Sequence, residues 1–115
     1  AMLGQGTSDP YCVCSIAGQP QLDKKRTKTV NNNANPVWNE SFTLVGMQEG
    51  SSLLFELYDE DTGKTDDFLG RASLDWLYIS KRYEGKLTLL DAGKGVNATL
   101  EVRVSCDVPA PGPTP

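Results

Sequence analysis

The sequence contains no histidine among its 115 residues. Ser-His-Asp and Cys-His catalytic arrangements, histidine-ligated zinc and histidine acid/base chemistry are therefore excluded. This absence argues against most hydrolases, and no other pairing of a nucleophile with a base stands out. We therefore expect a chain that is not an enzyme.

Long apolar runs are absent as well. No stretch approaches the roughly 18 apolar residues that a membrane span requires, and the first residues lack the basic and then apolar pattern of a signal peptide. We therefore expect a cytoplasmic protein. The 15 acidic residues outnumber the 11 basic ones, which argues against nucleic acid as a partner, because counterion-releasing binding requires a basic face.

Cysteine is scarce, and an odd count of three fits a reducing compartment. Cys12 and Cys14 lie two positions apart, which in a strand places both side chains on one face, poorly aimed at each other for a disulfide. Cys106 continues the apolar alternation of the segment before it. We interpret all three as small core side chains in preference to metal or redox centres.

Turn-forming residues are plentiful. Eleven glycines and seven prolines, with many Asn, Asp, Ser and Thr residues, recur at intervals of roughly eight to twelve positions, which is typical of short strands joined by turns. The chain length suits one domain with a modest core. We predict an all-β sandwich over residues 1–107, followed by a stiff, proline-rich linker or tail over residues 108–115.

Alternating apolar residues predict seven strands, the fifth of which runs into a short helical turn. Trp38 shares its parity with Phe42 and Leu44, so we expect Trp38, like Trp76, to pack inside and not to anchor in a membrane. The predicted strands are Tyr11–Ile16, Lys24–Val30, Trp38–Leu44, Leu53–Tyr58, Ala72–Ile79, Lys86–Leu90 and Ala98–Cys106.

The segment DEDTGKTDD at residues 59–67 concentrates acidic side chains between two apolar segments. Mutual repulsion among these carboxylates is costly unless positive charge compensates it. Calcium suits such a loop better than magnesium, because calcium accepts about six to eight oxygen ligands in flexible geometry. The loop is not an EF-hand, because it lacks a glutamate at the twelfth position and strands flank it.

Four blocks of sequence resemble C2 domains: GTSDPY at 6–11, KKRTKT at 24–29, NPVWNESF at 35–42 and LYDEDTGKTDDFLG at 57–70. The resemblance runs from about Gly6 to Asp107. It implies an antiparallel sandwich of two four-stranded sheets, with the family's first strand absent from this chain. The closing NATLEVRVSCDV resembles the last strand of the C2 topology found in phosphoinositide phospholipases C.

The resemblance also implies a calcium site. Four aspartates match the family's calcium ligands: Asp9, Asp59, Asp61 and Asp67. The backbone carbonyl of Glu60 would be a further ligand, whereas Asp66 lies outside the matched set and adds charge. Family members that bind calcium well usually carry another aspartate where this chain has Leu3. Weaker binding or fewer ions are therefore expected, because affinity follows ligand charge.

The function that the resemblance implies is calcium-dependent binding to phospholipid, which would bring a cytoplasmic module to the membrane periphery. Calcium reverses the sign of the acidic loop, and anionic membranes attract basic residues by about 1 kcal/mol each. Four basic residues are expected to contact lipid: Lys24, Lys25, Arg26 and Lys28. The alternative is that they form a solvated edge strand, on which lysine only prevents unwanted pairing.

Two other interpretations remain open. A calcium-independent C2 domain that binds proteins or acts as a scaffold is the alternative function, and Leu3 favours it. The absent first strand would leave an open sheet edge, which invites pairing with another chain. We therefore also expect a protein partner or a dimer formed through that edge.

Overall fold

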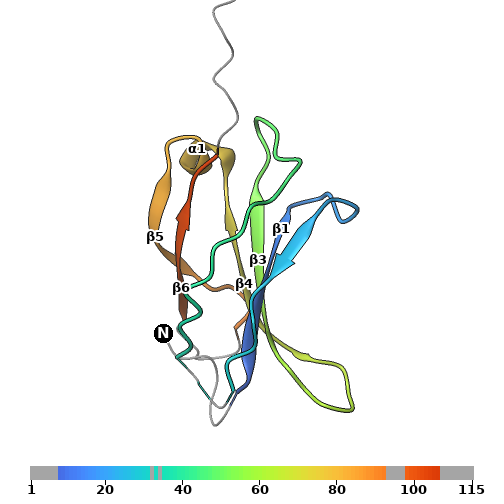
Figure 1. The fold of residues 1–115 in the computed structure, drawn as a ribbon. Coiled ribbons are helices and arrows are strands. Elements are labelled where there is room, and N and C mark those ends of the chain that lie inside the picture. Colours follow the sequence, from blue (N-terminus) through green and yellow to red (C-terminus); the bar gives the residue numbers. More distant parts are fainter. Residues whose placement is uncertain (1–7, 32, 34, 93–97, 107–115) are drawn as a thin grey trace, which may run out of the picture.

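Two antiparallel β-sheets pack face to face in the computed structural model of the chain, which describes residues 8–31, 33, 35–92 and 98–106 (Figure 1). The predicted β-sandwich is confirmed. No helix in these ranges is long and apolar enough to cross a membrane. The described elements are β1 (Pro10–Ile16), β2 (Lys24–Arg26), β3 (Leu53–Asp59), β4 (Asp67–Leu74), α1 (Trp76–Ile79), β5 (Tyr83–Thr88) and β6 (Thr99–Val104).

The first sheet has the strand order β2-β1-β3-β4. One of its two inner strands is β3, in which Leu53, Phe55 and Leu57 are buried while the residues between them are partly exposed. This two-residue period places one row of side chains against the core and the other row on the outer face. The alternation predicted from the sequence therefore sets which face of the sheet is buried.

The second sheet contains β5 and β6 among the described residues. Leu100 is buried and Val102 and Val104 are partly buried against the core, whereas Glu101 and Arg103 are exposed. The predicted closing strand is therefore present. The expected pair of four-stranded sheets is, within the described ranges, one sheet of four strands and one of two.

The predicted strand from Trp38 to Leu44 is wrong, because no regular strand forms there. Trp38 and Leu44 pack against the core and the Trp38 indole donates to the Pro10 carbonyl (3.3 Å), but Phe42 is 42% exposed. A strand requires a hydrogen-bonding neighbour, and the described part of the chain contains none beside this segment. Trp38 and Trp76 are nevertheless packing residues, as expected.

The predicted strand over Lys24–Val30 is shorter than expected, because β2 ends at Arg26. The chain still follows β1 beyond this point. The Thr27 amide donates to the Cys12 carbonyl (2.9 Å) and the Val30 amide donates to the Pro10 carbonyl (3.0 Å). The basic segment therefore stays beside the first strand up to the loop end of the sandwich.

Some sequence-based expectations fall outside the described residues. They are the role of Leu3 and the proline-rich tail at 108–115.

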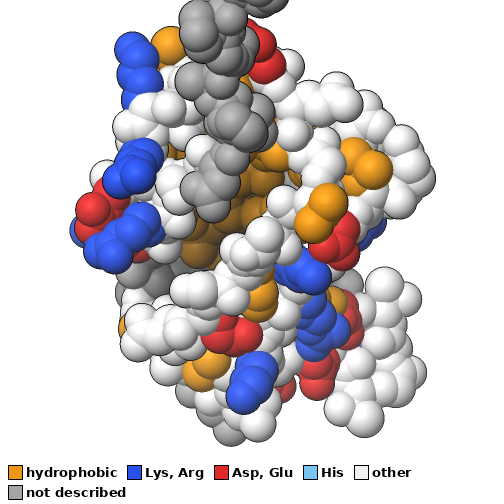
Figure 2. Space-filling model, turned by 45° about the horizontal axis from the view of Figure 1, so that its top comes forward, with side chains coloured by type: hydrophobic (Ala, Val, Ile, Leu, Met, Phe, Trp, Pro, Cys, Tyr) orange, Lys and Arg blue, Asp and Glu red, His pale blue; other side chains and the backbone are white. Residues whose placement is uncertain are grey.

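Figure 2 shows that apolar side chains line the floor of a hollow on the face turned toward the viewer. The core residues themselves are at most 7% exposed.

All three cysteines are free, and the core interpretation is confirmed. Cys12 belongs to the core cluster, and Cys14 and Cys106 pack against it. Burial raises the pKa of the Cys12 and Cys14 thiols to about 12 in each case. The reactive thiolate is therefore scarce at these two positions at neutral pH.

We predict that Cys12 and Cys14 resist alkylation in the folded protein. A pKa of about 12 in place of 9.0 lowers the thiolate fraction at pH 8 by about a thousandfold. Iodoacetamide labelling followed by peptide mass spectrometry should show slow modification at both positions, and urea should make it rapid. Equal labelling rates with and without urea would show that these thiols are not shielded.

Candidate functional site

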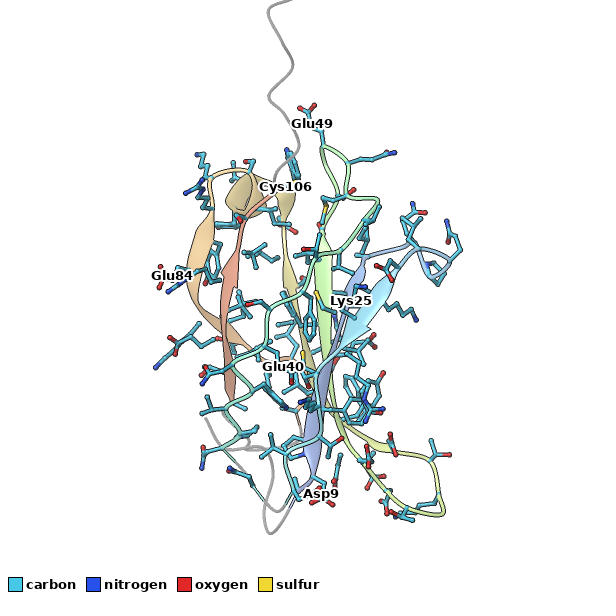
Figure 3. All side chains as sticks on the ribbon, viewed as in Figure 1. Asp9, Lys25, Glu40, Glu49, Glu84 and Cys106 are labelled. Atoms are coloured by element: carbon cyan, nitrogen blue, oxygen red, sulfur yellow. The ribbon has the colours of Figure 1, made fainter. Side chains whose placement is uncertain are left out.

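Antiparallel pairing gathers aspartates at one end of the sandwich. Asp59 is the last residue of β3, Asp67 is the first residue of β4, and the two are partners in the sheet register. Asp9 immediately precedes Pro10, which is the register partner of Asp59. Figure 3 shows Asp9 at the lower end of the molecule, the end from which the acidic loop between β3 and β4 extends. Residues distant in sequence therefore meet at this end.

Two backbone contacts fix Asp9 against the end of β3. The Asp9 amide donates to Asp59 Oδ1 (2.8 Å), and the Glu60 amide donates to the Asp9 carbonyl (2.9 Å). Asp9 and Asp59 are both half-buried. One oxygen of the Asp59 carboxylate is therefore held by the backbone just before β1.

Asp66 braces the acidic loop. Its Oδ1 accepts a hydrogen bond from the Asp61 amide (2.9 Å), and its Oδ2 accepts one from the Tyr11 hydroxyl. These two donors, the Tyr11 hydroxyl first, lower the pKa of Asp66. Burial, followed by the hydrogen bond to Asp66, raises the pKa of Tyr11 to about 12. The sequence did not reveal this brace, because the two partners are 55 positions apart.

Lys64 supplies positive charge within the loop itself. Its Nζ lies 3.3 Å from Asp61 Oδ2. The contact with Asp61 raises the pKa of Lys64, and the nearby charges of Asp67 and Asp59 act in the same direction. The side chain of Asp61 therefore faces a lysine in this structure.

Glu60 points its carboxylate toward the basic segment. Its Oε2 lies 2.6 Å from Arg26 Nη2 and accepts a hydrogen bond from the Thr29 hydroxyl (2.7 Å). The Thr29 hydroxyl, and after it Arg26, lowers the pKa of Glu60. This contact joins the acidic loop to the segment that follows β2.

An aromatic row crosses the outer face of the first sheet. The rings of Tyr11 and Tyr58 stack at 5.6 Å, Phe68 meets Tyr58 edge-on at 5.7 Å, and the Arg26 guanidinium lies 3.6 Å from the centre of the Tyr11 ring. Phe68 contacts the neighbouring Tyr58 ring but is 43% exposed. The shared outward parity of Tyr11 and Tyr58 was the sequence signal for this row.

The basic residues lie on the edge strand of the first sheet and just beyond it. Lys24, Arg26 and Lys28 are exposed, and Lys25 is half-buried with its Nζ 3.2 Å from Asp23. The Lys28 amide donates to Glu40 Oε2 (2.8 Å). Basic and acidic side chains therefore lie side by side along this edge.

The expected calcium ligands are gathered but not closed around one point. Within the described ranges, no group of three or more acidic, cysteine or histidine side chains is arranged to hold a metal ion. The side chains of Glu60 and Asp61 face Arg26 and Lys64 instead. Carboxylate and carbonyl oxygens are nevertheless the donors that calcium prefers, so the residues fit the ion in chemical kind.

Comparison with known proteins identifies the family. The C2 domain family model matches residues 1–89. Extended synaptotagmin-2-A of Xenopus laevis is 41% identical over 80 residues, 69% of this chain. Multiple C2 and transmembrane domain-containing protein 1 of Mus musculus is 40% identical over 97 residues, 83% of this chain. The chain spans only 9% and 10% of the lengths of these two relatives.

Solved structures agree with this comparison. A C2 domain of a plant extended synaptotagmin 1 superposes with a TM-score of 0.71 over 85% of this chain and 76% of that one, at 23% identity, which supports the fold alone. A calcium-bound structure of the two C2 domains of extended synaptotagmin 2 superposes with a TM-score of 0.69 over 88% of this chain and 36% of that one, at 31% identity.

The fold and the loop end thus define a small antiparallel β-sandwich with an acidic loop at one end. The chain belongs to the C2 domain family. Similar segments also occur in proteins that are named as enzymes. Two examples are the E3 ubiquitin-protein ligase Nedd-4 of Drosophila melanogaster and human GIVD cytosolic phospholipase A2.

Proposed function

We propose that this chain is a calcium-dependent phospholipid-binding module, itself without catalytic activity, that brings a cytoplasmic protein to membranes. Membership in the C2 family supports a module that binds phospholipid membranes. The observation that supports calcium dependence is the gathering of Asp9, Asp59 and Asp67 by the paired ends of β1, β3 and β4. One structural neighbour is described as calcium bound.

The calcium ligands in this proposal are the carboxylates of Asp9, Asp59, Asp61 and Asp67 and the backbone carbonyl of Glu60. Bound calcium would supply the positive charge that reverses the sign of this end of the molecule. The chain itself would hold these ligand oxygens in place. The Lys64 side chain, which competes with the ion for Asp61, would have to move away. Asp61 must exchange Lys64 for the ion, because the two side chains are 3.3 Å apart.

The basic residues supply the second part of the proposed membrane contact. Lys24, Arg26 and Lys28 are exposed at the edge of the first sheet, and Lys25 is half-buried there. Near an anionic surface each would contribute about 1 kcal/mol. The edge strand and the loop end of β3 are linked through the Arg26 and Glu60 side chains. We therefore propose that one face of the sandwich presents both the basic edge and the acidic loop end to the membrane.

A calcium-independent module that binds protein is the second candidate. It is favoured by Lys64 and Arg26, which already place positive charge against Asp61 and Glu60 without a metal ion. Leu3, in place of a ligand aspartate in the family, favours it too.

We predict saturable calcium binding that depends on Asp59. Isothermal titration of calcium into chelator-stripped protein should give heat, and Asp59→Asn should weaken binding by about tenfold or more, because affinity follows ligand charge. Asp23→Asn, the same substitution just before β2 at the far end of the first sheet, should leave the titration unchanged. If the unmodified protein gives no heat at millimolar calcium, the calcium-independent candidate replaces our proposal.

We also predict that the basic edge strengthens membrane binding. Combined Lys24→Gln, Lys25→Gln and Lys28→Gln should weaken calcium-dependent sedimentation with phosphatidylserine vesicles by about fivefold per residue that contacts the surface. The combination Lys81→Gln, Arg82→Gln and Lys86→Gln removes the same charge from around β5 and is the control. Equal losses in the two triple variants would mean that only net charge matters, and lipid contact by the basic edge would be rejected.

Self-association through the open sheet is a further part of the proposal. β6 has β5 as its single neighbour among the described strands, and an unpaired edge invites a strand from another chain. Sedimentation velocity over a wide concentration range should show a concentration-dependent dimer. A monomer throughout that range would remove the second copy from the set of partners.

A further inference from the structure

The edge of β6 that faces away from β5 has no hydrogen-bonded neighbour among the described strands. The Leu89 amide donates to the Ala98 carbonyl at 2.9 Å, and these two residues continue the register of β5 and β6. Because hydrogen-bonded and non-hydrogen-bonded pairs alternate along antiparallel strands, the even-numbered residues of β6 bond to β5. The amides and carbonyls of Thr99, Glu101 and Arg103 therefore point toward the open edge.

The segment over residues 37–45 borders the same core without forming a strand. Trp38 and Leu44 pack against the core cluster, as Val102 of β6 does. Asn39 has a positive φ of 50°, which interrupts an extended backbone. Figure 1 shows the segment diverging from β6 as it rises, and Figure 2 shows a hollow with an apolar floor. Two described stretches of the chain thus border one core, and no backbone hydrogen bond joins them.

The outer face of β6 carries one charge that lacks an ionic partner in the described part of the chain. Arg103 is paired with Glu84 at 2.9 Å. Glu101 is exposed, and it forms no ion pair even with Lys86, its register partner on β5. Side chains directly opposite each other in neighbouring strands interact, and opposite charges stabilise such a pair. A strand added beside β6 therefore fits best with a basic residue opposite Glu101.

We propose that the open edge of β6 receives an extended segment of a partner protein, with apolar side chains at alternate positions and a basic residue opposite Glu101. An extended strand matches the row of backbone donors and acceptors along this edge. Its inward side chains would cover Val102 and Val104, which are only partly buried. The inference rests on the open edge in the proposed function and deepens it, because it names the chemistry of the partner.

A bound strand would also give the segment over residues 37–45 the neighbour that it lacks. Asparagine adopts both positive φ and extended conformations, so Asn39 can straighten when a strand lies beside it. The bound strand and the straightened segment would join β5 and β6 in a sheet of four strands. The second sheet would then match the first sheet in strand number.

The test is isothermal titration with a synthetic peptide, in chelator and at protein concentrations that keep the chain monomeric. The probe is the acetylated peptide Thr-Val-Thr-Val-Lys-Val-Thr, in which antiparallel pairing places the central threonine opposite Arg103 and the lysine opposite Glu101. N-methylation of these two peptide residues removes the donors that face β6 and should weaken binding by about tenfold or more. Equal binding of both peptides would show apolar contact without strand pairing and would overturn the inference.

Proline substitution locates the edge that is used. Glu101→Pro removes an amide that faces the open edge and does not bond to β5, and it should weaken binding by about tenfold or more. Lys86→Pro is the matched control, because the amide of this register partner faces the other edge of β5. Glu101→Gln, which removes only the charge, should weaken binding by about fivefold or less. Unchanged binding by Glu101→Pro would overturn the inference.

The methylated peptide is compared on the unmodified protein, so that result holds even if a proline variant folds poorly. Sedimentation velocity with the peptide separates a partner segment from a second copy. Dimers that persist in excess peptide, without peptide heat, would assign the edge to a second copy and would overturn the inference. Peptide binding by a chain that stays monomeric would support it and would reject self-association alone. Calcium and vesicles are absent from these mixtures, so failure here is distinct from failure of phospholipid binding.

Discussion

The pairing of β1 with β3 is the interaction on which the other features of the molecule depend. Its register places Tyr11 opposite Tyr58 and Pro10 opposite Asp59. One face of the pair then contributes Cys12 and Leu57 to the core, and the other carries the aromatic rings. A slip of one residue would exchange these faces. The same register therefore determines the core and the acidic end.

Part of the negative charge at the acidic end is compensated by basic side chains of the same chain. Asp61 faces Lys64, Glu60 faces Arg26, and Asp66 accepts hydrogen bonds from the Tyr11 hydroxyl and the Asp61 amide. The Asp59 carboxylate instead accepts a hydrogen bond from the Asp9 amide. A calcium ion would therefore find part of its ligand set already positioned and would have to displace cations from the rest. In our proposal, calcium would therefore compete with Lys64 for the Asp61 carboxylate.

Sequence patterns predicted the elements whose determinants are local. The alternation in Leu53–Tyr58 and the acidic composition of 59–67 were sufficient to predict β3 and the loop. The strand expected over Trp38–Leu44 did not form, although Trp38 and Leu44 do pack against the core. The alternation of apolar residues in this segment indicates only which side of it is buried, whereas a strand also needs a hydrogen-bonded neighbour. The contact of Tyr11 with Asp66 depends on tertiary register, so no short stretch of sequence could reveal it.

The same limit explains why the side chain of Glu60 was not predicted to contact Arg26. β2 and β3 lie on opposite sides of β1, and each step between neighbouring strands is about 4.8 Å. The two side chains must therefore together span two strand spacings, roughly 10 Å, and also the offset along β1 between Val13, which is opposite Arg26, and Asp9, which is bonded to Glu60. The Arg26 guanidinium crosses the Tyr11 ring. Arginine can lie flat on that ring while its edge reaches the carboxylate, whereas lysine has no planar group to stack. Aspartate would be one methylene shorter than glutamate. The geometry of three strands thus accounts for the pairing of an arginine with a glutamate across a tyrosine at this position.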